Sequence, residues 1–299
     1  SKTNLSRMSL MTPATPSLET PSGKGAADEN FPVGSRLIAA RLRPHVMTFY
    51  AYARAIDDIA DNPALSPEQK IERLDQFAVA VAHGSADPAL ATAQRMYQSL
   101  LETRISPRHC TDLVSAFKQD AVKNRYADWR ELIDYCNRSA APVGRYLLDL
   151  HGENPALYGH ADALCNALQV INHLQDCKDD LATLDRCYLP GDWLVAAGAR
   201  VEDLRASAAS PALRQVICRC VGATQALLDQ AAWLAPRLNN HRLGLESAVI
   251  YKIARRLCRR LQQEDPVAGR VALSKAAASA SAMAAIIAYP FARIQARRA

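Results

Sequence analysis

Apolar positions along this chain are spaced as in helices rather than in strands. Alanine, leucine and arginine are frequent, no run of alternating β-branched residues occurs, and no Asn-Gly or Asp-Gly turn separates two such runs. Residues 30–275 show no shift in composition and no long linker, which indicates one domain. The pattern therefore predicts an all-α protein, a bundle of about ten helices joined by short connections.

Capping residues place some of the helix ends. Ser66-Pro-Glu-Gln69 is a capping box with proline in the first turn, and the helix it opens should end at His83-Gly84. Asp128 predicts another start. That helix should run towards Gly152 and bend or break at Pro142, because proline removes a backbone donor.

Two pairs of aspartates interrupt this apolar pattern. Asp57 and Asp61 share one predicted helix, and Asp176 and Asp180 share another, each pair with the spacing Asp-x-x-x-Asp. Both carboxylates of a pair then lie on one helix face, where like charges cost roughly 0.2–0.5 kcal/mol. Solvated helix faces would be the simpler interpretation, but apolar and aromatic neighbours flank both pairs and favour faces that look inward. A cation between the two pairs would explain both.

The type of ligand selects the cation. Carboxylate oxygens, without His or Cys at coordinating spacing, suit hard Mg²⁺, with Mn²⁺ as a substitute. Mg²⁺ is usually held by a few carboxylates together with substrate phosphates. The two acidic pairs therefore predict a diphosphate substrate, bound where the two helices face each other across a cavity.

Composition narrows the other choices. The chain has 299 residues, of which 49% are hydrophobic and 22% charged, a balance typical of globular proteins with a substantial core. The net charge of +6 indicates an anionic partner. Nucleic acid is excluded as that partner, because no recognition motif occurs and only 6% of residues are aromatic. Eight scattered cysteines predict reduced thiols and a cytoplasmic location.

The two ends differ from the middle. Residues 1–29 are rich in Ser, Thr, Pro and Gly and predict a flexible leader, residues 30–288 form the predicted domain, and residues 289–299 form a basic tail. The apolar segment 276–288 has about 13 residues, too short for a bilayer span of about 20. It is either a core helix or a surface helix at a membrane. In the second case three arginines would contact lipid headgroups: Arg293, Arg297 and Arg298.

A second basic stretch leaves a similar choice between a solvated helix face and a face that contacts anionic lipid, by which the protein would associate with a membrane. Its residues are Lys252, Arg255, Arg256, Arg259 and Arg260.

Both acidic pairs belong to longer motifs spread over residues 30–275. These motifs are Phe31, residues 41–44, residues 49–58, Tyr135-Cys136, residues 142–144, Gln169, Asn172, Asp176, Asp180, residues 185–190 and residues 270–274. Together they resemble the squalene/phytoene synthase family of isoprenoid synthases. The resemblance implies an isoprenoid synthase type helical bundle with a central apolar cavity.

The resemblance also implies roles for individual residues. Metal binding falls to Asp57, Asp61, Asn172, Asp176 and Asp180. Substrate binding falls to Phe31, Arg54, Gln169, Asn172, Gln175, Tyr251 and Arg270, with Arg54 and Arg270 on the diphosphate. Tyr50 joins the four aspartates as a catalytic residue that lines the cavity.

Gln175 indicates the branch of the family. Family members that couple two prenyl diphosphates resemble one another in carrying Arg at this position, and Gln lacks the bidentate phosphate grip of Arg. The chain is most similar to the bacterial hydroxysqualene synthase branch, which implies presqualene diphosphate as substrate, capture of a rearranged cation by water, and no NADPH. Two alternatives remain, condensation of two farnesyl diphosphates and a non-catalytic assembly protein of the same fold.

Overall fold

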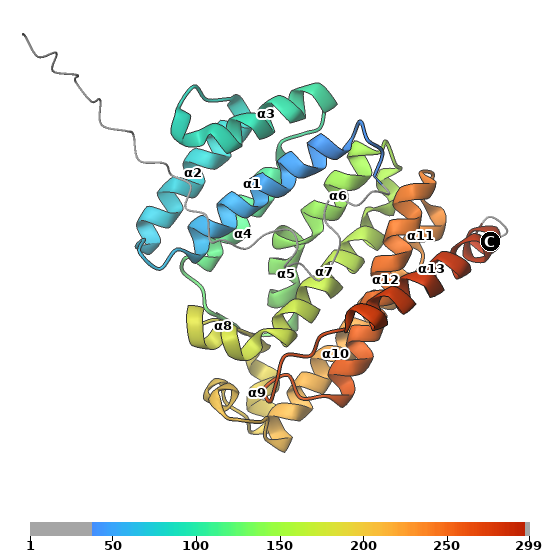
Figure 1. Ribbon diagram of the computed structural model, residues 1–299. Coiled ribbons are helices and arrows are strands. Elements are labelled where there is room, and N and C mark those ends of the chain that lie inside the picture. The colour runs from blue at the N-terminus through green and yellow to red at the C-terminus, as the bar shows by residue number, and fades with distance from the viewer. Residues whose placement is uncertain (1–37, 297–299) are drawn as a thin grey trace, which may run out of the picture.

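The computed structural model describes residues 38–296, and this part of the chain is almost entirely helical (Figure 1). Its helices are α1 (Arg43–Asp61), α2 (Pro67–His83), α3 (Ala91–Thr103), α4 (Arg108–Asp120), α5 (Trp129–Ser139), α6 (Ala141–Leu150), α7 (Tyr158–Gln175), α8 (Cys177–Leu184), α9 (Gly191–Ala197), α10 (Pro211–Ala231), α11 (Leu234–Arg237), α12 (His241–Gln263) and α13 (Lys275–Ala296). Two short strands, β1 (Arg125–Tyr126) and β2 (Cys187–Pro190), pair in parallel. The all-α prediction is confirmed. Phe31 and the predicted leader 1–29 lie outside the described residues.

The predicted capping residues begin their helices. Ser66 Oγ accepts a hydrogen bond from the Gln69 backbone at 3.3 Å, and the Gln69 side chain accepts one from Ser66 N at 2.9 Å. Asp128 accepts a hydrogen bond at 2.8 Å from the backbone three residues further on and starts α5. The break predicted at Pro142 occurs at Ala140, because a proline fits the first turn of the next helix, α6.

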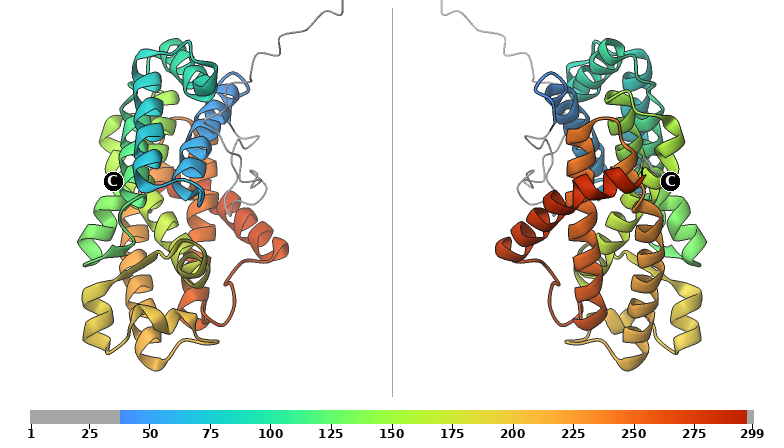
Figure 2. Two further views of the ribbon diagram at one scale, coloured as in Figure 1. Left: turned by 90° about the vertical axis from the view of Figure 1, so that its left-hand side faces the viewer. Right: turned by 90° about the vertical axis from the view of Figure 1, so that its right-hand side faces the viewer.

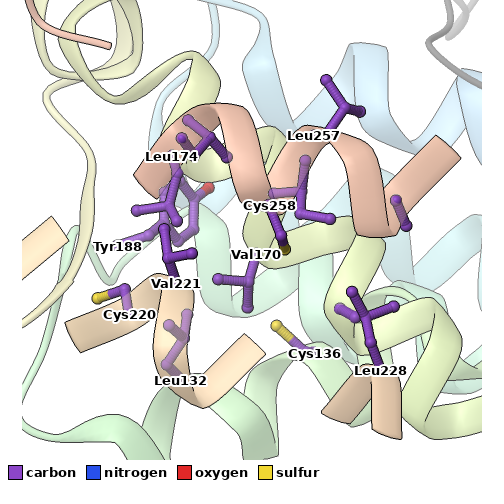
Figure 3. Close-up of a cluster of buried hydrophobic side chains, with 14 of the residues drawn as sticks. Leu132, Cys136, Val170, Leu174, Tyr188, Cys220, Val221, Leu228, Leu257 and Cys258 are labelled. Atoms are coloured by element: carbon purple, nitrogen blue, oxygen red, sulfur yellow. The ribbon is translucent and has the colours of Figure 1, made fainter. Parts of the chain in front are cut away.

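Two hydrophobic cores lie side by side. One joins α1 to α4 around fully buried side chains such as Phe77, and it includes part of α6. The other joins α5, α7, α10 and α12, where Val170, Leu174, Val221 and Leu257 lie in one cluster (Figure 3). α1, which carries the first acidic motif, and α7, at whose end the second motif begins, belong to different cores, and residues of both line the space at the seam between these cores.

An apolar cavity of about 230 Å³ lies in this seam. Its walls come from α1, α6, α7, α11 and α12. Hydrocarbon side chains dominate the described lining, and the side chains with polar atoms or sulfur are Tyr50, Cys165, Glu246 and Ser247. The predicted central apolar cavity is thereby confirmed.

The C-terminal helix is longer than expected. α13 has 22 residues and continues through Pro290. The first part of the predicted basic tail 289–299 is therefore helical, as far as Ala296. By length and composition alone α13 is long and apolar enough to cross a bilayer, with a mean hydropathy of 1.3 and 22% of its most apolar stretch buried. The argument that the segment 276–288 is too short to span a bilayer is therefore wrong.

α13 crosses the outer side of α12 (Figure 2). Its inner face is buried at Ser281, Ala285, Tyr289 and Arg293. Arg293 donates hydrogen bonds to the carbonyl of Leu238 and to Tyr289 Oη, so the prediction that it contacts lipid headgroups is wrong. The outer face exposes five large apolar side chains: Met283, Ile286, Ile287, Phe291 and Ile294. The helix is thus neither a core helix nor detached from the bundle.

Gly244 sets the spacing between α12 and α13. A Cβ added at this position would lie 2.0 Å from Tyr289 Oη and 2.9 Å from the Ala235 carbonyl oxygen. Gly244→Ala should therefore destabilise the fold by about 1–3 kcal/mol in urea unfolding, because the two helices must separate. Gly222→Ala in α10 is the matched control: an added Cβ there meets no described neighbour, so we expect a gain of about 0.5–1 kcal/mol. Equal effects of the two substitutions would contradict this account.

Candidate active site

The first acidic pair occupies the last two turns of α1. Asp57 and Asp61 lie on one continuous helix, as predicted. Arg54 accompanies them, with Nη1 3.0 Å from Asp57 Oδ2 and Nε 3.5 Å from Asp58 Oδ1. Tyr50 lies two turns before Asp57 and lines the apolar cavity, so α1 connects the acidic site to the cavity over about 10 Å of helix.

Burial and several neighbouring charges act on the carboxyl group of Asp57. Partial burial, together with the negative charge of Asp61, raises its pKa to about 7, although Arg54 opposes the shift. The side chain still keeps 30% of its surface accessible. A carboxylate that resists ionisation yet stays accessible is ready for a cation to stabilise its charged form.

The second acidic pair does not lie in one helix. α7 ends at Gln175 and α8 begins at Cys177, with Asp176 between them at φ −106° and ψ 9°. The prediction of a single continuous helix is therefore wrong for this pair, although Asp180 N still donates to the Asp176 carbonyl at 2.8 Å. The bend directs the Asp176 carboxylate to Arg270, whose Nε lies 2.7 Å from its Oδ1.

Arg186 connects the two motifs. Its backbone N–H donates to the Asp180 carbonyl at 3.2 Å, and its Nη1 donates to Asp61 Oδ1 at 2.7 Å. Its Nη2 reaches the carbonyl of Asp120 at 3.2 Å. Burial opposes the charge of Arg186, but Asp120 and Asp61 hold its pKa above the usual value. One buried guanidinium thus fixes the end of α1 against the turn that follows α8.

Sequence reasoning assigned no role to Arg186, although it lies within the motif 185–190. It also assigned no role to Asp120, whose carbonyl accepts a hydrogen bond from Arg186, or to Tyr135, which contacts Asp120. Burial raises the pKa of Asp120 to about 6, and Tyr135 Oη donates to its carboxylate at 2.7 Å. One feature of the sequence could have indicated a role for Arg186: the charged pair Asp185-Arg186 comes directly before the apolar residues of β2. A charge in such a position is seldom buried unless it is paired.

The aromatic side chains behind the site are packed face to face. His173 stacks on Tyr188 with ring centroids 3.4 Å apart. Burial, together with the nearby charge of Arg186, lowers the pKa of His173 to about 3, so the imidazole is neutral at physiological pH. This packing fits a structural role for His173.

Gln175 is a buried residue at the C-terminal end of α7. The residue is 3% exposed, and its side-chain amide donates to the carbonyl of Val271, the neighbour of Arg270. It therefore positions the segment that brings Arg270 to Asp176. Asn172 and Gln169 are half-buried on α7, one and two turns before that bend.

Tyr251 lies on α12, next to the cavity-lining Ile250. Its side chain packs against the α7–α10–α12 core, and partial burial raises its pKa. The structure therefore places Tyr50 in the cavity wall and Tyr251 beside it.

The donor set fits a hard cation that is shared with a ligand. Within residues 38–296, no group of three Asp, Glu, His or Cys side chains comes close enough to hold a metal ion. Each motif offers carboxylate oxygens beside a guanidinium group, and oxygen is the donor that Mg²⁺ prefers. An ion here would be held by these carboxylates together with water and oxygens of the bound ligand, as Mg²⁺ commonly is.

Asp57→Asn should make the metal-free protein more stable at alkaline pH. Between about pH 4 and 7 the folded chain holds a proton on Asp57 that the unfolded chain releases, so stability falls as pH rises through this range. The neutral variant lacks this loss, and we expect it to gain about 1–3 kcal/mol at pH 8 and little at pH 4. Urea unfolding with chelator at both pH values measures the difference.

The exposed carboxylate of Asp179 on α8 provides the control for this prediction. Asp179→Asn should not reproduce the gain in stability at pH 8 that we expect for Asp57→Asn. The account fails if Asp57→Asn keeps the parent's fall in stability between about pH 4 and 7.

Comparison with known proteins agrees with this geometry. The squalene/phytoene synthase family model matches residues 25–277. A hydroxysqualene synthase of Rhodopseudomonas palustris is 45% identical, covering 85% of this chain and 87% of the relative. One from Zymomonas mobilis is 42% identical, covering 85% and 86%. A phytoene synthase of Pseudescherichia vulneris is 30% identical, over 66% of this chain and 67% of its own length.

Solved structures show the same fold. A squalene synthase of Alicyclobacillus acidocaldarius superposes with a TM-score of 0.69 and 31% identity, covering 80% of this chain and 90% of its own. A dehydrosqualene synthase superposes with a TM-score of 0.70 at 18% identity, covering 86% and 90%, which bears on the fold alone. From the acidic motifs, the apolar cavity and these matches together, we conclude that the chain belongs to the squalene/phytoene synthase family.

Proposed function

We propose that this protein converts presqualene diphosphate to hydroxysqualene and inorganic diphosphate. One observation carries the proposal: two acidic motifs, each with its own arginine, lie at one end of an apolar seam that contains a cavity. Such a site suits a ligand with a diphosphate at one end and a long hydrocarbon at the other. The family acts on substrates of this class.

The charged end would bind and release the diphosphate. Asp57, Asp61, Asp176 and Asp180 would hold Mg²⁺, which when bound stabilises the negative charge that develops on the leaving diphosphate. Arg54 and Arg270 lie against the acidic side chains, where their N–H groups can donate to diphosphate oxygens. Such donors stabilise the departing anion and thereby favour ionisation.

The apolar end would protect the carbocation. Phe49 and Tyr50 line the cavity, so their ring faces can stabilise a positive charge by cation–π attraction. Phe49 is held in place by Tyr146, with ring centroids 4.0 Å apart and nearly parallel. A largely hydrocarbon lining keeps water away until the cation has rearranged.

Similarity supports the hydroxysqualene branch over a condensing synthase. Three relatives named hydroxysqualene synthase are 39–45% identical over most of this chain, whereas the phytoene synthases are 28–33% identical. Gln175 supports the same branch, because its neutral amide gives the site one guanidinium group less than arginine would. We therefore expect no reductive step and no nicotinamide cofactor.

The decisive assay uses the purified protein with presqualene diphosphate and Mg²⁺, with and without NADPH. We expect hydroxysqualene in both cases, no NADPH oxidation, and loss of turnover with chelator that added Mg²⁺ restores. Asp61→Asn should lower kcat at least about 100-fold, since it removes a carboxylate at the diphosphate end. Asp179→Asn, also an aspartate near the site but exposed, is the matched control and should stay near the parent rate.

Three results would redirect this proposal. Presqualene diphosphate formed from farnesyl diphosphate alone would identify a condensing synthase. NADPH-dependent squalene would identify a reductive one. Absence of Mg²⁺-dependent turnover with either substrate would favour a non-catalytic protein of the same fold.

We further propose that α13 docks on a lipid surface by apolar insertion. Its outer face exposes Phe291 by 67% and Ile287 by 62%, and the helix contains no acidic residue. The basic stretch on α12 contributes less than its sequence suggests, because most of its arginines are engaged. Arg255 pairs with an aspartate of α10, Arg256 with the start of α13, and Arg260 with an adjacent glutamate.

Vesicle co-sedimentation tests this docking. Because the exposed face is apolar, we expect binding to neutral phosphatidylcholine vesicles that persists at high salt. Phe291→Glu should reduce the bound fraction about tenfold or more, since burial of one large apolar side chain contributes about 1.5–3 kcal/mol. Val195→Glu is the matched control, because Val195 is 80% exposed on α9, outside the docking face. Binding only to anionic vesicles, or none, would refute apolar insertion.

A further inference from the structure

Asp120 is a buried acidic residue that contacts Arg186. It ends α4 and is 4% exposed. Its Oδ2 accepts a hydrogen bond from Tyr135 Oη at 2.7 Å, and its backbone carbonyl accepts one from Arg186 Nη2 at 3.2 Å. The same guanidinium donates through Nη1 to Asp61 Oδ1 at 2.7 Å. Arg186 therefore lies between Asp120 and a carboxylate to which the proposed function assigns metal binding.

The charge of Arg186 acts on both aspartates. A guanidinium group that contacts one carboxylate cancels much of its charge, and such a carboxylate attracts a cation only weakly. Burial opposes the charge of Arg186, but Asp120 and Asp61 together raise its pKa. Burial raises the pKa of Asp120 to about 6, and the charge of Arg186 opposes that shift. At pH 8 both aspartates are therefore ionised, and the two carboxylates and one guanidinium leave one net negative charge.

A second cation makes the charge of Asp120 more important. Lys70 on α2 is half-buried, and burial together with the charge of Arg186 lowers its pKa. Asp61 and Asp120 oppose this shift, so the four groups interact. With Asp120 ionised, two negative and two positive charges balance. Without it, positive charge is in excess around Asp61, and this excess would oppose the binding of Mg²⁺.

We propose that Asp120 is a positioning residue that sets the cation affinity of the first acidic motif through Arg186. This inference rests on the proposed function. Asp120 balances the charge of Arg186, so the guanidinium can hold Asp61 in place without cancelling the negative charge that Asp61 offers to a cation. The hydrogen bond from Tyr135 fixes the Asp120 carboxylate in this position.

Binding of Mn²⁺ alone tests this inference, because electron paramagnetic resonance measures the free ion directly. The protein is stripped of metal with chelator and titrated at pH 8, where Asp120 is ionised. Asp120→Asn keeps the size of the side chain and an acceptor for Tyr135 but removes the charge. We expect the dissociation constant for Mn²⁺ to rise at least about tenfold. In turnover, the Mg²⁺ concentration that gives half the maximal rate should rise by a similar factor.

Removal of both buried charges separates charge balance from packing. Asp120→Asn combined with Arg186→Gln leaves Asp61 without a guanidinium that cancels its charge. We therefore expect the dissociation constant for Mn²⁺ to return to within about threefold of the parent value. If Asp120 acted only by packing, the second substitution would add its own damage to that of the first.

Asp149→Asn is the matched control. Asp149 on α6 also accepts a hydrogen bond from a tyrosine, Tyr158, and its Oδ2 lies 2.7 Å from His109 Nε2. His109 lies in the first turn of α4 and Asp120 at its end, about 16 Å apart along the helix axis. Asp149→Asn should therefore leave the dissociation constant for Mn²⁺ unchanged.

Each outcome decides the inference. An unchanged dissociation constant in Asp120→Asn overturns it, and so does an equal rise in Asp149→Asn or a parent protein that binds no Mn²⁺. If Asp120→Asn does not fold, the double substitution decides, because it removes the buried pair together and leaves no unpaired charge. Binding about tenfold weaker than in the parent would then overturn the inference. A parent protein that binds Mn²⁺ but forms no hydroxysqualene would refute the proposed function and not this inference.

Discussion

The buried Arg186 guanidinium is the interaction on which the geometry of the site depends. It binds the Asp61 carboxylate of the first motif, while its backbone N–H binds the Asp180 carbonyl of the second. Two helices from different hydrophobic cores are held together at this point by a charge that is almost fully removed from water. Loss of one partner of such a pair typically costs 3–5 kcal/mol, because the other charge stays buried and uncompensated. The acidic site is thus held in place where Arg186 binds it, whereas its carboxylates repel one another.

The seam between the two cores gives this arrangement its chemical use. Carboxylates crowd one end of the seam, and the cavity occupies the part lined by Phe49 and Leu164. Burial raises the pKa of Asp57 and the nearby charge of Asp61 adds to this shift, so an ionised carboxylate here opposes folding of the metal-free protein. A well-packed seam would be more stable, but it would leave no room for a hydrocarbon chain. The protein is therefore less stable than it could be, both at the carboxylates and at the cavity. A ligand with a charged head and an apolar body can restore this stability by binding to both.

The sequence predicted local features well and long-range ones poorly. The Ser66 capping box and the Asp128 cap depend on neighbours within four residues, so their motifs were sufficient. The bend at Asp176 was missed because the hydrophobic spacing continues through it, and only the contact with Arg270, 94 residues away, shows its purpose. The length of α13 was missed for a similar reason. The apolar segment was predicted to end at residue 288, whereas the helix packs against α12 and continues through Pro290 to Ala296.

Gln175 shows how a residue can influence a site through the segment that it contacts. Its amide is buried on the Val271 carbonyl, and the adjacent Arg270 is thereby presented to Asp176. A longer cationic side chain at position 175 would have to bury its charge beside this carbonyl or extend past it towards the acidic motifs. Burial would be costly, and extension would add a guanidinium group to the diphosphate end of the cavity. The proposed reaction of a single diphosphate has no need of that extra charge, so the choice between glutamine and arginine follows from what lies next to position 175.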